Sequence, residues 1–183
     1  MANNDHLTRA GYAVGVWNKW RDEHPDVLPD LSGANLSAGR YPKGKFFKAN
    51  LTKTDFRRSN MREIDLHESN LSQADLSKTD LRGANLSKAI LTRAELQKAT
   101  LIGANLTGAD LSGADLEKAQ VDKSDLTGAK LSGAKLIKTD METVVGLTQE
   151  QIDEALGDQT TKLPRGLVRP VAWPKNPKTG EVK

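Results

Sequence analysis

Charged residues at a regular spacing are the main candidates for chemistry in this sequence. Acidic residues recur every twenty positions, at Asp55, Asp75, Glu95 and Asp115. A basic residue follows each of them three positions later, at Arg58, Lys78, Lys98 and Lys118, and Lys138 continues the basic series. A fixed interval between charges of both signs is typical of a binding strip or of a solvated surface. We therefore treat the first eight of these residues as a candidate partner-binding surface.

The same charges also have a purely structural interpretation. Acidic and basic side chains can neutralise each other along a solvated face, where each exposed pair contributes about 0–1 kcal/mol. We favour mutual neutralisation over the binding strip, because exposed charge ladders usually serve solvation. Both interpretations stay open at this point.

The sequence offers no catalytic, cofactor or metal site. There is no cysteine, and the three histidines, His6, His24 and His67, lack the spacing of metal ligands. The glycines belong to a repeat and form no phosphate-binding loop. No apolar run reaches the length of a membrane span, and no secretory leader is visible. We therefore expect a non-enzymatic, cytoplasmic protein without cofactors and without a membrane partner.

An apolar residue every five positions is the dominant pattern of the chain. All 23 positions from Leu31 to Met141 are apolar. The residue two positions before each of them is small, most often alanine, and Ile64 is the clear oversized exception. A period of five fits neither a helix, at 3.6, nor a flat strand, at 2. The pattern instead indicates a chain that turns a corner in every pentad, with the apolar and small residues inside.

This repeat resembles the pentapeptide-repeat family, whose motif reads A-(D/N)-L-x-x. Residues 104–119, ANLTGADLSGADLEKA, match the motif closely, and the resemblance covers about residues 30–143. It implies an all-β solenoid, a right-handed quadrilateral β-helix with four pentads in each coil. The pentads then form just under six coils, and a strand spacing of about 4.8 Å gives a rod of roughly 28 Å. Residues twenty apart stack on such a rod, so the charged residues form an acidic and a basic column side by side.

The flanking segments are expected to cover the two ends of the rod, whose strand edges are otherwise unpaired. Residues 6–22 predict one amphipathic helix on the first coil, with helical spacing of Leu7, Ala10, Val14, Trp17 and Trp20. At the other end, a short helix is predicted with Thr148 as N-cap, Gln151 three residues later and Gly157 as terminator. Its inward residues are expected to be Ile152, Ala155 and Leu156.

The chain therefore divides into four parts. We expect an N-terminal capping helix and linker (1–29), the β-helix (30–143), a C-terminal capping helix (144–157) and a proline-rich basic tail (158–183). The first part of the tail is expected to pack on the rod through Leu163, Leu167, Val171 and Trp173, and the stretch from Asn176 to be loose.

One stretch near the N-terminal end breaks the motif. Residues 39–49, GRYPKGKFFKA, place Phe47 at an outward position beside basic residues. An exposed aromatic residue there would mark a contact surface. Packing beneath the N-terminal helix is the interpretation we favour, because irregularity beside a capping element is expected in solenoids.

These features favour a rigid protein-interaction scaffold whose partner is another, unidentified protein. The resemblance implies an alternative, a DNA-mimicking protector or inhibitor of a type II topoisomerase (DNA gyrase). Such proteins are implied to be acidic dimers joined at their C-terminal ends, whereas residues 31–143 here carry 18 basic and 14 acidic side chains, a net charge of +4. Binding of nucleic acid is disfavoured because no recognition motif is present. A monomer and a homodimer through the C-terminal end both remain open.

Overall fold

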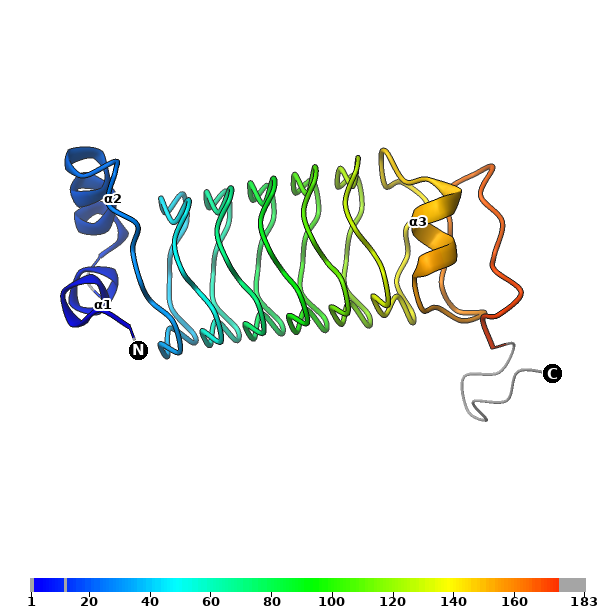
Figure 1. Cartoon of the computed structure of the whole chain (residues 1–183), viewed down its shortest axis with the longest axis horizontal. Helices are drawn as coiled ribbons and strands as arrows, with labels where there is room; N and C mark the ends of the chain where they lie inside the picture. Colours follow the sequence, from blue (N-terminus) through cyan, green and yellow to red (C-terminus); the bar gives the residue numbers. More distant parts are fainter. Residues whose placement is uncertain (1, 12, 175–183) are drawn as a thin grey trace.

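The protein is a rod of stacked coils with helices at both ends (Figure 1). The computed structural model describes residues 2–11 and 13–174, so the stretch from Asn176 lies outside the described residues. The helices are α1 (Asn4–Gly11) and α2 (Val14–Glu23) at one end, and α3 (Gln149–Glu154) at the other. Among the described residues, no helix combines the length and the apolar character needed to cross a membrane.

The coils are joined by single parallel β-bridges between residues twenty apart. They run from Asp30↔Asn50 to Asp125↔Val145, one in every pentad. Twenty residues in each coil correspond to four pentads, which gives the coil four sides. This is the quadrilateral register that the resemblance to the pentapeptide-repeat family implies.

Each pentad forms one side and one tight turn, as residues 81–85 illustrate. The N–H of Ala84 donates to the carbonyl of Leu81 at 3.0 Å, and Gly83 between them has a φ of +66°. A positive φ at the third residue is the mark of a type II turn. The N–H of Asn85 then donates to the carbonyl of Ile64 in the preceding coil at 2.9 Å. The corner and the bridge thus alternate every five residues, which explains a period that neither helix nor flat strand can give.

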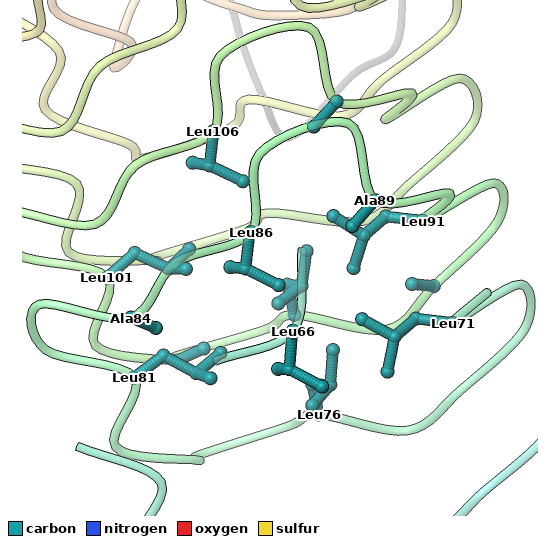
Figure 2. Close-up of a cluster of buried hydrophobic side chains, with 14 of the residues drawn as sticks. Leu66, Leu71, Leu76, Leu81, Ala84, Leu86, Ala89, Leu91, Leu101 and Leu106 are labelled. Atoms are coloured by element: carbon teal, nitrogen blue, oxygen red, sulfur yellow. The ribbon is translucent and has the colours of Figure 1, made fainter. Parts of the chain in front are cut away.

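Leucine and alanine fill the inside of the rod. Leu66, Leu86 and Leu106 lie one above another in successive coils (Figure 2), and all are at most 1% exposed. The oversized Ile64 is fully buried as well. Several small positions hold a buried hydroxyl instead of alanine; Thr79, for example, donates to the carbonyl of Phe56 at 2.8 Å. Such a bond removes the cost of burying a hydroxyl group.

The N-terminal segment contains two helices, so the prediction of a single helix over 6–22 was wrong. Ala13, just before α2, has an extended backbone with φ −56° and ψ 138°. Gly11 and Gly15 flank this position and both lower helix propensity, which accounts for the break. Of the predicted inward residues, Ala10, Trp17 and Trp20 are buried.

Helix α2 lies against the first coil. The indole of Trp17 stacks on Phe46 with 4.8 Å between the ring centroids, and its N–H donates to the carbonyl of Lys45 at 2.9 Å. Arg21 is 1% exposed and donates to the carbonyls of Val27, at 2.6 Å, and Phe47, at 3.3 Å. Burial lowers the pKa of this guanidinium. The rings and the arginine together fix the helix to the coil.

The structure supports the packing interpretation for Phe47. Its ring stacks on His67 with 5.1 Å between centroids and an interplanar angle of 8°. The guanidinium carbon of Arg21 lies 4.2 Å from the centroid of the Phe47 ring. Phe47 therefore sits between α2 and the second coil, half-buried rather than free on the surface.

Helix α3 begins as predicted but ends differently. Thr148 and Gln151 form a reciprocal capping box at its start. The helix ends at Glu154, before Gly157, because Ala155 is already extended with φ −84° and ψ 166°. Ile152 and Ala155 are buried as expected, whereas Leu156 is 53% exposed. Leu156 points outward because it bridges to Lys135 and so takes the outward position of a pentad.

The stack of coils continues beyond residue 143, where the repeat pattern ends. After α3, Leu156 bridges to Lys135 and Lys162 to Asp140. The buried hydroxyl of Thr161 donates to the carbonyl of Leu136 at 2.8 Å, as threonines do inside the repeat. Residues 156–162 therefore add a further partial coil that lacks the sequence motif.

Trp173 closes the C-terminal end of the rod. It is 5% exposed, and its indole N–H donates to the carbonyl of Ala155 at 2.9 Å. Gly157 lies so close to the ring that a Cβ there would be 2.4 Å from Trp173 Cζ3. Leu163 and Leu167 pack on the core as predicted, but Val171 is 96% exposed, so its inclusion was wrong.

Candidate functional site

The predicted charged residues lie on one side of the rod, the side whose inward residues run from Leu36 to Leu136 in steps of twenty. We call this side the charged face. The four acidic residues, which we call the acidic column, are joined in order by the bridges Asp55↔Asp75, Asp75↔Glu95 and Glu95↔Asp115. The structure therefore brings these four predicted residues together in one ladder.

The basic residues form a second ladder on the same face, at the corner of the coil. We call Arg58, Lys78, Lys98, Lys118 and Lys138 the basic column. Each has a positive φ between 58° and 61°. The N–H of Arg58 donates to the carbonyl of Ser77 at 3.1 Å, and that of Lys78 to Gln97 at 3.0 Å. These backbone bonds hold the cations in register, and all five side chains are exposed.

The acidic column has its own cations, which sequence reasoning missed. Arg57 binds Asp55 through Nη2 and Oδ2 at 2.7 Å and reaches Asp75 through Nε at 3.4 Å. Lys135 approaches Asp115 at 3.6 Å. The sequence did hold a clue, since Arg57 stands two positions after Asp55 and Lys135 twenty after Asp115.

Neutralisation between the two columns, which we favoured, is not found. In residues 2–11 and 13–174, no ion pair joins the acidic column to the basic column. Lys118 and Lys138 instead approach Glu117, at 2.8 and 3.9 Å. Arg58, Lys78 and Lys98 have no ion-pair partner within this part of the chain. Most of the positive charge of the basic column therefore faces the solvent.

Hydrogen bonds from Arg57 neutralise part of the negative charge of the acidic column. The hydrogen bonds from Arg57 hold the pKa of the Asp55 carboxyl below its usual range. The same contact raises the pKa of Arg57. Asp55 thus stays ionised but locally compensated. Among the described residues of the two columns, those without an ion-pair partner are Arg58, Lys78 and Lys98, together with Glu95.

A shallow depression lies where the basic column meets the middle of the face. It has a volume of about 410 Å³ and is lined by Ser37, Ala38, Arg57, Arg58, Ser77 and Lys78. Three cationic side chains line it, whereas the hydroxyls of Ser37 and Ser77 already donate to Asn35 and Gln97. An anionic group such as a carboxylate is the chemistry that such a lining favours.

Comparisons with known proteins agree with this architecture. The family model for pentapeptide repeats matches with 8 copies, over residues 49–87, 69–108, 89–128 and 104–143, which together span more than half of the chain. None of the curated proteins compared with the chain matches it significantly.

Several solved structures are similar to the rod. Trypsin-treated QnrB1, a plasmid-mediated fluoroquinolone resistance protein, is 20% identical with a TM-score of 0.57, and the match covers 81% of this chain and 79% of QnrB1. A pentapeptide repeat protein from the Arabidopsis thaliana thylakoid lumen is 26% identical with a TM-score of 0.45, covering 66% of this chain and 74% of its own. The similar solved structures are pentapeptide repeat proteins, which form right-handed quadrilateral β-helices. The chain belongs to the pentapeptide repeat family.

Proposed function

We propose that this protein is a non-enzymatic interaction rod that binds another protein through the charged face. The observation that carries the proposal is the basic column, whose cations are held in register by the backbone; within residues 2–11 and 13–174, Arg58, Lys78 and Lys98 have no ion-pair partner. Charged groups on a rigid surface attract a partner of complementary charge and fix its orientation. The partner surface is accordingly acidic.

Matched variants test this proposal. The column variant is Lys78→Gln with Lys98→Gln, and the control variant is Lys88→Gln with Lys123→Gln. All four lysines are exposed and have a positive φ at the same place in the pentad, but the control pair lies on other faces. The purified chains are used to capture proteins from a lysate of the source cells. We expect a protein retained by the wild type and the control variant and lost with the column variant; equal loss or equal retention with both variants contradicts the proposal.

A DNA-mimicking protector of DNA gyrase is the second candidate. The similarity of fold to QnrB1, with its TM-score of 0.57, favours it. The net charge of +4 over residues 31–143 and the pairing of the acidic column with Arg57 and Lys135 oppose it, because mimicry of DNA requires a negative potential. A supercoiling assay with gyrase and a fluoroquinolone separates the two candidates. Restored supercoiling on addition of the protein would favour mimicry, and unchanged inhibition would remove it.

Covered ends favour action as a monomer. We propose that α1 and α2 protect the first coil, and that α3 and the segment up to Trp173 protect the last. The close packing of Trp173 on Gly157 covers the terminal core, while Leu156, Val168 and Val171 remain exposed at this end. Sedimentation equilibrium of the full chain checks this. A mass twice that of the chain, lost on deletion of residues 163–183, would contradict it.

A further inference from the structure

The basic column differs in two ways from the other three columns of positive-φ turn residues. Each of the other three columns contains two or three glycines, which take this conformation without strain, beside longer residues such as Lys53, Gln73 and Lys88. These glycines are Gly33, Gly113 and Gly133 in one column, Gly83 and Gly103 in the second, and Gly108 and Gly128 in the third. The basic column has no glycine at all. All five of its turns thus carry long side chains, although glycine would relieve the strain of a positive φ.

Charge stacking is the second departure. In the other turn columns, charged neighbours in adjacent coils have opposite signs, as in Lys43–Glu63 at 3.4 Å and Lys48–Glu68 at 3.7 Å. In the basic column the neighbour in the next coil carries the same sign, and like charges opposite each other are destabilising. A sequence that violates local preference twice at the same positions is typical of a functional surface.

The spacing of this column selects one kind of partner. We propose that the charged face binds an α-helix that lies parallel to the rod and carries one acidic residue per turn along one side. This inference rests on the proposed function, and it specifies the structural element of the partner that the basic column binds. The corners of the coils line up along the rod (Figure 1), and the five basic residues are twenty positions apart, so they follow one corner from coil to coil.

Comparison of repeat lengths supports a helix over the alternatives. Neighbouring coils are about 4.8 Å apart, and an α-helix rises about 5.4 Å per turn, a mismatch of about 0.6 Å per step. Side chains on one side of an extended strand repeat at about 6.8 Å, a mismatch of about 2 Å. The charges of one strand in a DNA duplex repeat at about 3.4 Å, a mismatch of about 1.4 Å. The mismatch is smallest for the α-helix. Flexible lysine and arginine side chains can adjust to a difference of this size along the whole column.

The column also sets the length of the helix. Four intervals between five coils span about 19 Å, which corresponds to about 13 residues of helix at 1.5 Å each. The depression between Arg57, Arg58 and Lys78 lies toward the N-terminal end of the column and can accommodate one carboxylate. Arg57 already compensates Asp55 and Asp75, so these acids offer little repulsion to the stripe.

Designed peptides test the inference with the full-length protein. The striped probe is an alanine-based, fluorescently labelled peptide of about 20 residues with one glutamate per turn on a single side, long enough to cover the column. The permuted probe has the same composition with its glutamates spread around the helix. A third probe carries the stripe with two central prolines, which break the helix. Oligo-dT and inorganic polyphosphate serve as the phosphate-bearing polyanions.

Fluorescence anisotropy at low salt gives the affinities. We expect the striped helix to bind about tenfold more tightly than the permuted probe, the broken helix and both polyanions, because only it pairs with several cations at once. The column variant Lys78→Gln with Lys98→Gln is expected to remove that advantage, and the control variant Lys88→Gln with Lys123→Gln to retain it. Equal binding of the striped and permuted probes, or tighter binding of a polyanion, would overturn the inference.

The two experiments distinguish failure of the helical-partner inference from failure of the proposed function. If no peptide binds but a cellular protein is still lost specifically with the column variant, the face is an interaction surface and the helical partner is wrong. If the column variant behaves like the wild type in both experiments, the proposed function fails together with the inference. Loss of peptide binding in the control variant as well would show that only general positive charge matters, which would also overturn the helical match.

Discussion

Replacing Gly157 by alanine tests how the C-terminal end of the rod is closed. The new Cβ would lie 2.4 Å from Cζ3 of Trp173 and 2.6 Å from its Cε3 and Cη2. Gly157 does not have a left-handed backbone conformation, so the substitution adds a contact and no backbone strain. The ring is rigid and 5% exposed, and it can only make room by moving out of its site.

The expected cost follows from this geometry. Ordinary carbon contacts lie at about 3.5–4.0 Å, so the ring must shift by more than about 1 Å and its N–H bond to Ala155 is weakened. Overpacking of this kind costs about 1–3 kcal/mol. Contacts in a solenoid are made between neighbouring coils. The substitution should therefore lower the free energy of local opening of residues 155–174 and leave the rest of the rod unchanged.

Hydrogen exchange read by mass spectrometry measures this opening. We expect faster exchange in residues 155–174 of Gly157→Ala, and unchanged exchange in the central coils. Trp173→Leu serves as the coupled control, since a smaller side chain leaves room for the Cβ. Adding Gly157→Ala to Trp173→Leu should then cost much less than adding it to the wild type. An equal cost in both backgrounds, or no effect of Gly157→Ala alone, would refute the packing described here.

Four further substitutions probe the turns, the capping of α3 and the charges. Gly103→Ala should lower the free energy of unfolding by about 1 kcal/mol, because φ is +66° and the added Cβ meets no atom within 4 Å, so the cost comes from backbone strain alone. Lys98→Gly should raise the free energy of unfolding. Urea unfolding midpoints that move in the same direction for both variants would contradict this. Thr148→Ala should cost about 1 kcal/mol of helix stability, seen as faster exchange confined to α3, and exchange unchanged there would argue against the cap. A hydrogen bond from Arg82 holds the pKa of Asp80 below its usual range, so its contribution to stability is complete above the unfolded pKa of about 3.9 and is lost as the pH falls through the lowered value. The difference in melting temperature between wild type and Asp80→Asn should therefore be present at neutral pH and shrink in acid, and a constant difference would count against it.

The interior of the rod could be predicted from the sequence almost completely. A leucine every five residues, with a small residue two positions before it, fixes which side chains point inward. Leu31, Leu86 and Leu136 are fully buried accordingly. The prediction succeeds because the same local arrangement recurs in every pentad, so a single exception such as Ile64 does not obscure it.

The ends could not be predicted in the same way, because their contacts occur only once. Gly157 looks like a helix terminator in the sequence, but its role is to admit the ring of Trp173. Leu156 fits the apolar face of a helix, yet the chain has already returned to the coil at that point. No periodicity reports contacts between residues such as Gly157 and Trp173, which lie far apart in sequence and meet only after folding.

The charged face was predicted in its position and not in its pairing. The interval of twenty placed Asp55 and Asp75 in one column, as found. The identity of the compensating cation depends on side-chain reach, and Arg57 in the middle of the face reaches both acids while Arg58 at the corner pairs with neither. Backbone register therefore follows from the sequence pattern, whereas the choice between adjacent arginines requires coordinates.

Site-specific crosslinking tests most directly whether the charged face is the surface that binds the partner. The chain has no cysteine, so a single one can carry a photo-crosslinker. Gln97→Cys places it on the charged face between the two columns, and Thr107→Cys places it at the same position of the pentad on another face. We predict that irradiation in lysate links the partner to Gln97→Cys and not to Thr107→Cys, and that high salt abolishes the product. A partner linked through Thr107→Cys alone would contradict the account.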